Sequence, residues 1–447
     1  MLALRLTRGA HPAVQLRRLL VAAASAGTGL LLLCTLGYAL SHPDDPPGAL
    51  LRLGWCTVPL AATVHFAVAA ARTDPGTRPR PGLSAIGLGP ARLMAVSATT
   101  TALSTALGSM LALLVFLHLR GDITGMPFDG AAAQFLAVGR PLPVPATLTL
   151  LSLVPAAASL SVALVLRPRE PSPAPARVPL RAFGRFGAYG SGAMRETFGA
   201  YGRFGAHLRR GPRDVQPQPP AAAPEQEPVG PAANTPSPSA PETSDQHPNP
   251  TATLPWSIAT LAAGLAVEAY AGNTTATTDM PGGLTSGPVG VLLGWLLTAV
   301  ALAVAGPGIT YLCGRLLQTV RPGALRLLAG RVLMEEASRI GRPLGIVCAV
   351  ASAAYAMAAL QKPDGPTFGP LTTLGALLVG GCTLATLLTT AVEAKHARAD
   401  TTAALVRLGA PTAMLRAAAT VRAAALVAVF APLTLIVAAL AAQPLTR

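Results

Sequence analysis

Three ionisable side chains lie inside or at the edge of long apolar segments, where such groups are uncommon and usually have a role. His65 lies deepest, and its pattern fits either a packing histidine or a gating or proton-relay group. Glu268 stands near the outer end of its segment, where a residue at the membrane boundary is favoured over one on a transport pathway. Glu393 stands at the inner end of another. These three are the intramembrane candidates.

The familiar catalytic and nucleotide-binding patterns are absent from the sequence. It contains no GxxxxGK[ST] phosphate loop, no HExxH and no GxSxG. The cysteines Cys34, Cys56, Cys313, Cys348 and Cys382 fall within or beside apolar segments, without a CxxC spacing. They are therefore expected to be small buried residues rather than disulfide partners or metal ligands. We expect no catalytic residues, no metal, no cofactor and no enzyme activity.

The apolar segments that contain these residues are long enough to cross a membrane. Of the 447 residues, 51% are hydrophobic and only 12% are charged, whereas soluble chains carry about 25% charged residues. About 20 apolar residues span the hydrocarbon layer, and backbone groups in lipid must be satisfied within a helix. The sequence predicts an all-α polytopic membrane protein with spans near residues 17–40, 51–71, 93–118, 144–166, 254–271, 288–313, 344–361, 371–393 and 413–441.

The basic residues alternate between connections, as the positive-inside rule requires of short loops. Arginines precede the first span and follow the second, fourth and sixth, and Lys395, Arg398 and Arg407 follow the eighth. This predicts a cell-membrane protein with a cytoplasmic amino terminus. The same rule accounts for the net charge of +15. No basic domain carries interleaved aromatic residues, so nucleic acid is not an expected partner.

A long segment rich in Pro, Ala and Gly divides the chain. We expect residues 168–252 to be a disordered cytoplasmic linker, because so few aliphatic residues cannot offset the ordering entropy. Its Phe/Tyr/Gly/Arg duplication at 183–189 and 198–204 fits either a plain spacer or a segment lying on anionic lipid. The expected domains are 1–167 with four spans, this linker, 253–343 with two bridging spans and a basic loop, and 344–447 with three spans.

A short motif recurs in the two halves, each time between two spans on the predicted cytoplasmic side. The first copy contains Leu83, Ile86 and Gly87, and the second contains Leu405, Arg407, Leu408 and Gly409. In the second copy, Asp400, Thr401 and Thr402 offer an N-cap, Ala403 to Leu408 form a short helix, and Gly409 suits a left-handed C-cap. The pattern fits either an ordinary interhelical loop with a glycine stop or an interfacial helix that presents an apolar knob.

The stretch from Ala403 to Pro411, with the charged run from Glu393 to Arg398 before it, resembles the signature of FtsX-like (MacB-type) ABC transporter permeases. The resemblance covers the spans and inner loops. It implies that Leu405, Arg407, Leu408 and Gly409, with the weaker copy Leu83, Ile86 and Gly87, dock on a separate ATPase subunit. That ATPase and the lipid bilayer are the expected partners, and a second copy of the chain or a partner permease is also compatible.

The chain departs from that family in two ways. It has only short connections at 41–49 and 362–369, where the family usually has a large extracytoplasmic domain, and its second module lacks a final span. The leading hypothesis is an ABC permease subunit for export or mechanotransmission. The alternatives are a membrane scaffold that kept the fold without transport and a proton-coupled secondary transporter.

Overall fold

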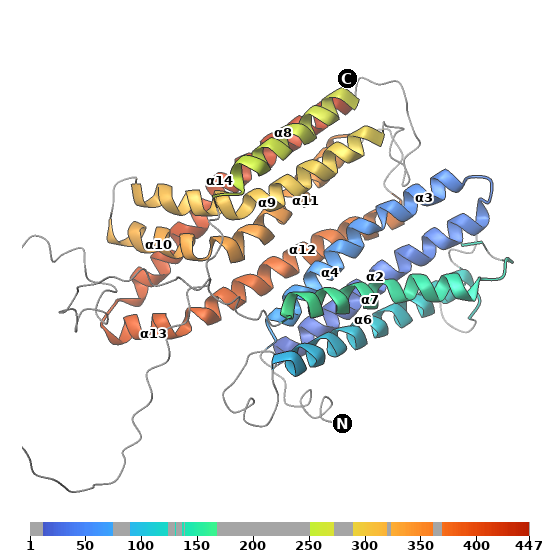
Figure 1. Cartoon of the computed structure of the whole chain (residues 1–447), viewed down its shortest axis with the longest axis horizontal. Coiled ribbons are helices and arrows are strands. Elements are labelled where there is room, and N and C mark those ends of the chain that lie inside the picture. Colours follow the sequence, from blue (N-terminus) through green and yellow to red (C-terminus); the bar gives the residue numbers. More distant parts are fainter. Residues whose placement is uncertain are drawn as a thin grey trace, which may run out of the picture. The chain divides into compact units, whose positions relative to one another are not determined.

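The computed structural model describes residues 12–74, 90–123, 130, 136–137, 139–167, 251–271, 289–319, 323–360 and 369–446. Residues 168–250 of the predicted linker therefore lie outside the described residues. The described part is helical and contains no strand (Figure 1). Its helices are α2 (Pro12–Ser41), α3 (Pro46–Trp55), α4 (Thr57–Arg72), α6 (Pro90–Arg120), α7 (Val144–Leu166), α8 (Leu254–Ala271), α9 (Val289–Thr319), α10 (Ala324–Glu335), α11 (Ala337–Leu360), α12 (Pro370–Ala397), α13 (Ala399–Arg407) and α14 (Thr412–Thr446).

Within the described ranges, nine helical segments are long and apolar enough to cross a membrane. They are α2, α3 with α4, α6, α7, α8, α9, α11, α12 and α14. Each overlaps one predicted span, and the predicted bounds for α7 and α8 agree to the residue. The prediction of a helical, multi-pass membrane protein is confirmed at this level. Several helices run beyond the predicted spans; α9, for example, continues to Thr319.

The second span is interrupted in its amino-terminal half, where α3 ends and α4 begins. Asp45 caps α3 by accepting a hydrogen bond from the Gly48 backbone at 3.0 Å. At Cys56 the backbone N–H bonds to the carbonyls of Arg52 and Leu53, which closes α3 before α4 starts. The Arg52 guanidinium lies 3.6 Å from the centre of the Tyr38 ring. The break is therefore held by local contacts to the end of α2.

The helices of the amino-terminal half pack around α2, and hydroxyl groups form their interhelical bonds. The Ser25 hydroxyl donates to the Thr105 carbonyl at 2.7 Å, and the hydroxyls of Thr28 and Thr63 lie 2.9 Å apart. Gly108 lets α6 approach α2, since a Cβ there would lie 2.2 Å from the Ala22 carbonyl oxygen. Small residues and hydroxyls are the usual means by which membrane helices associate.

A second set of helices surrounds α9, which packs against α8, α10 and α11 through glycines. A Cβ on Gly306 would lie 2.0 Å from the Gly341 carbonyl oxygen, so α9 and α11 meet backbone to backbone. Gly314 and Gly330 meet in the same way between α9 and α10. No side chain separates the helix axes at these points.

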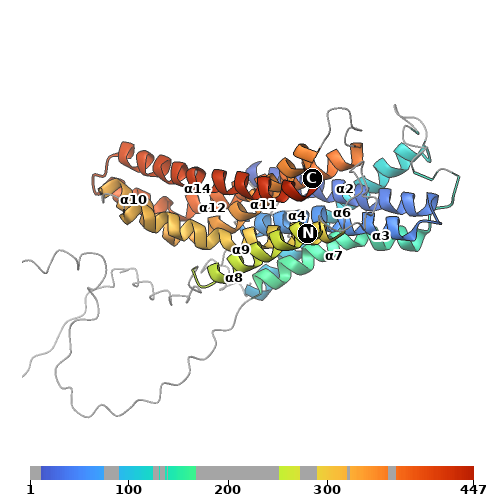
Figure 2. The ribbon, with the colours of Figure 1, turned by 90° about the horizontal axis from the view of Figure 1, so that it is seen from above.

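The helix α12 connects the two sets. It packs against α4 and α2 on one side and against α11 on the other, as the second view also shows (Figure 2). The Thr63 hydroxyl lies 3.9 Å from the Cys382 sulfur at the contact of α4 with α12. All five cysteines are buried and free, which confirms that they pack as small side chains.

Candidate functional site

The helix α13 stands out because it makes almost no contact with the other described helices. Every residue from Ala399 to Gly409 is exposed. Leu408 is 85% exposed and Leu405 36% exposed, although both side chains are apolar. Arg407 is the last residue of the helix. A short helix that presents leucines to solvent is typical of a surface that another molecule covers.

The end of α13 is formed as the sequence predicts. Gly409 has φ of +89°, a left-handed conformation that glycine adopts without steric cost. Its N–H donates to the Val406 carbonyl and that of Ala410 donates to the Leu405 carbonyl, each at 3.0 Å. These two bonds are the Schellman arrangement. The cap fixes Leu408 at the tip and turns the chain at once into α14.

The beginning of α13 differs from the prediction. The helix starts at Ala399 rather than Ala403, and the cap position is occupied by Arg398 without a side-chain cap. The hydroxyls of Thr401 and Thr402 do not cap the helix, because both donate backward to the Arg398 carbonyl at 2.9 Å. The proposed N-cap of Asp400, Thr401 and Thr402 is therefore wrong. α12 and α13 are separated only by Arg398, so α13 continues directly from the end of a span.

An ion pair connects the junction of α12 and α13 to the junction of α10 and α11. Arg398 Nε lies 2.6 Å from Glu336 Oε1, with the two side chains 27% and 12% exposed, and Arg398 Nε also donates to the Ala394 carbonyl. Glu336 is the residue between α10 and α11. Burial raises the pKa of Glu336 above its ordinary value, and Arg398, Arg422 and Arg339 lower it by less. The pair thus joins two helix junctions in a partly buried place.

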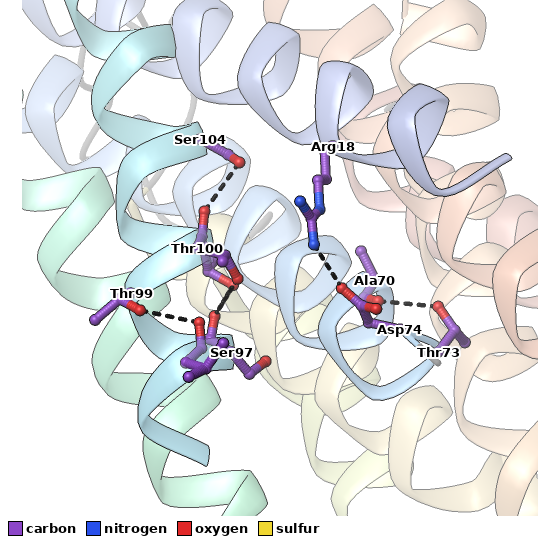
Figure 3. Close-up of polar contacts among 10 residues, drawn as sticks. Arg18, Ala70, Thr73, Asp74, Ser97, Thr99, Thr100 and Ser104 are labelled. Atoms are coloured by element: carbon purple, nitrogen blue, oxygen red, sulfur yellow. Dashed lines mark hydrogen bonds and ion pairs between the residues drawn. The ribbon is translucent and has the colours of Figure 1, made fainter. Parts of the chain in front are cut away.

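A similar ion pair of reversed polarity occurs in the amino-terminal half (Figure 3). Arg18, near the start of α2, lies 2.9 Å from Asp74, which follows α4. In the carboxy-terminal half, Glu336 lies just before α11, and Arg398 follows α12, which is the next span. Each pair therefore ties the start of one span to the end of the next, just before a short motif. The first motif copy, Leu83, Ile86 and Gly87, lies outside the described residues.

A small cavity adjoins Arg18 and Asp74 between α2, α4 and α6, with both polar and apolar lining residues. Its lining includes Arg17, Ser97, Thr100 and Ser104. About 30 Å³ is open to water, which suffices for about two water molecules. The Thr100 hydroxyl donates to the Ser97 carbonyl and that of Ser104 to the Thr100 carbonyl, so these groups are satisfied within α6 (Figure 3).

The three intramembrane candidates lie apart from one another and differ in environment. His65 is partly buried in α4, and its Nε2 has no hydrogen-bond partner among the described residues. Glu268 is completely buried and accepts a hydrogen bond from the Thr298 hydroxyl of α9 at 3.0 Å. Glu393 is partly exposed near the end of α12. The structure brings none of the three together.

Sequence reasoning missed Glu336, Asp74 and Thr298, whose partners come from distant segments. One signal was available: Glu336 and Asp74 are acidic residues within connections otherwise rich in arginine, which the positive-inside rule does not require. No protein family, curated protein or solved structure matches the chain. The functional argument therefore rests on the site itself.

Proposed function

We propose that this chain is an FtsX-like permease subunit of an ABC system and that α13 docks on a separate ATPase subunit. The observation that carries the proposal is the exposure of Leu405 and Leu408 on a capped helix that continues directly from a span. A rigid apolar knob at the end of a span can transmit a displacement of its partner to the membrane helices. In interfaces of this kind a few apolar side chains supply most of the binding energy.

Two further features support a pair of permease modules. The contacts of α2 with α4 and α6 have counterparts in those of α11 with α12 and α14, and α4 packs against α12. If α2, α4 and α6 correspond to α11, α12 and α14, the equivalent second spans of the modules face each other. The ion pairs Arg18–Asp74 and Arg398–Glu336 then occupy corresponding places. Ligation of ATP by the chain itself is not part of the proposal, since it has no phosphate loop.

The deciding experiment introduces charge at the two exposed leucines of this motif, Leu405 and Leu408. Changing Leu405 and Leu408 to Asp together would bring two carboxylates into an apolar groove, at a cost of several kcal/mol. That cost weakens a micromolar contact by orders of magnitude. The full chain is co-expressed with candidate ATPases in the cell membrane, and the measurements are ATPase co-purification and ATP turnover.

A matched control carries the same two substitutions on the other face of α13. Ala399 and Ala403 are exposed, lie four residues apart and point away from the leucines by helical spacing. Their change to Asp should leave co-purification intact. The pair Leu83 and Ile86 should show a smaller loss than Leu405 and Leu408. If the leucine variant retains its ATPase at normal membrane abundance, the permease proposal fails and a non-transporting scaffold becomes the better account.

A further inference from the structure

A second site lies between α8 and α9, far along the chain from α13, and involves the buried acid Glu268. The residue has 0% exposure, and its Oε1 accepts the 3.0 Å bond from Thr298. Its Oε2 is also buried and has no hydrogen-bond partner among the described residues. An unpartnered carboxyl oxygen in this position requires an explanation, because buried polar groups are generally hydrogen-bonded.

Glycines on both helices form the slot that holds this side chain. A Cβ on Gly294 would lie 2.3 Å from Glu268 Cγ, so any larger residue at 294 would displace the acid. A Cβ on Gly264 would lie 2.6 Å from Thr298 Oγ1, the atom that donates to Glu268. The acid, its donor and two glycines therefore fit together at one level of the contact between α8 and α9.

On the helices that pack against α8, the described residues near Glu268 provide no charge to balance a carboxylate. α8 packs on α9 and α14. On α8 the other titratable side chain is Tyr270, which is 77% exposed. α9 has no titratable side chain before Tyr311, and α14 has none after Arg422. An isolated carboxylate buried without a countercharge costs far more than a neutral acid with one unsatisfied hydroxyl.

We propose that Glu268 is a proton-binding site, in which the carboxyl group holds a proton at neutral pH between α8 and α9. Oε1 is the carbonyl oxygen that accepts the Thr298 hydrogen bond, and Oε2 carries the proton. Loss of that proton leaves a full charge in the contact, so α8 must move from α9 to hydrate it. The site couples proton occupancy to the separation of these two helices, whether or not α13 docks on an ATPase.

Infrared spectroscopy of the full purified chain in lipid nanodiscs tests this directly. The carbonyl stretch of a protonated carboxyl is distinct from the stretches of a carboxylate. At pH 7 the difference between wild type and Glu268→Gln should contain the loss of one protonated carboxyl. Glu393→Gln is the control, because that side chain is partly exposed, and it should leave the band in place. Loss of carboxylate bands in Glu268→Gln would overturn the proposal.

Two other variants keep the test decisive if Glu268→Gln does not fold. Thr298→Val removes the hydrogen bond to Oε1, so the protonated-carboxyl band should shift to higher frequency without disappearing. Glu268→Asp keeps the acid with a shorter side chain and should also shift the band. Absence of any such band in the wild type at pH 7, or a band unchanged in both variants, would rule out a proton held at this site.

Discussion

The two sets of helices are held together by different chemistry. Around α2, glycines such as Gly108 and Gly29 are combined with directional hydroxyl bonds such as that of Thr28 with Thr63. Around α9, the closest contacts with α11 are backbone on backbone, at Gly306 and Gly345. A hydroxyl bond can exchange its partner when helices shift, whereas a glycine contact has no side chain to rearrange. We therefore expect α9 and α11 to move as a unit, and relative motion to occur at other helix contacts.

The largest expected effect comes from filling a glycine contact in the α9 set. Gly306→Ala places a Cβ at 2.0 Å from the Gly341 oxygen, so α9 and α11 must separate. We expect a loss of about 1–3 kcal/mol of stability, in the range of overpacked cores. The measurement is thermal unfolding in detergent, followed by the reaction of the five buried cysteines with a thiol-reactive dye.

The matched control for that change is Gly381→Ala on α12. Nothing lies within 4 Å of a Cβ at this position, so the variant should be neutral or slightly more stable. Equal melting temperatures for Gly306→Ala and Gly381→Ala would show that the backbone contact contributes nothing.

The two ion pairs give the next largest effect and differ in burial. Arg398→Gln leaves the carboxylate of Glu336 partly buried without its closest cation, so we expect a loss of about 1–2 kcal/mol, below that of fully buried pairs. Arg18→Gln should cost about 0–1 kcal/mol, because the acid that it leaves unpaired, Asp74, is 20% exposed, whereas Glu336 is 12% exposed. Unfolding temperatures of both variants decide the order. A larger loss for Arg18→Gln would reverse this part of the comparison.

A smaller effect is expected for the hydroxyl contact of α2 with α4. Thr28→Val and Thr63→Val each remove one hydroxyl of the 2.9 Å pair and keep the branched shape. A double-mutant cycle should give a coupling energy of about 0.6 kcal/mol, typical of hydroxyl bonds between membrane helices. Strict additivity of the two losses would mean that the hydroxyls do not stabilise the contact.

The smallest effect is a dependence on pH at Glu336. Because burial raises its folded-state pKa above the ordinary 4.5, this residue's contribution to stability is fully present below that value. The contribution is lost as pH rises through the raised pKa. Glu336→Gln mimics the protonated form, so its melting temperature should rise relative to wild type as pH increases from 4.5 toward neutrality. A relative decline over that interval would mean that Arg398 outweighs burial and lowers the pKa.

Much of the fold could be predicted because membrane spans are encoded locally. A run of uncharged apolar residues bounded by arginine or proline locates α7 and α8 to the residue, and Gly409 with Pro411 locates the end of α13. The start of α13 could not be predicted, because Thr401 and Thr402 bond equally well forward as caps or backward to Arg398.

The burial of Glu268 could not be predicted from the sequence, for a different reason. Glu268 stands one turn from the end of α8, which favours a boundary position, yet its burial depends on the register of Gly294 and Thr298 on another helix. The partner of Glu336 is likewise about sixty residues distant in sequence. Such pairings depend on how helices rotate against one another, and the hydropathy of either helix alone does not specify that rotation.

The complete exposure of α13 also has a consequence for protein turnover. Arg398 and Arg407 lie at the two ends of an exposed helix, and the next residue, Leu408, is 85% exposed. Between α12 and α14, trypsin should therefore cut at Arg407, and cellular proteases that remove subunits lacking their partners should recognise the same segment. The amount of the chain in a cell would then follow the supply of the molecule that covers Leu408. The exposure of α13 would thus set the ratio of the chain to its partner.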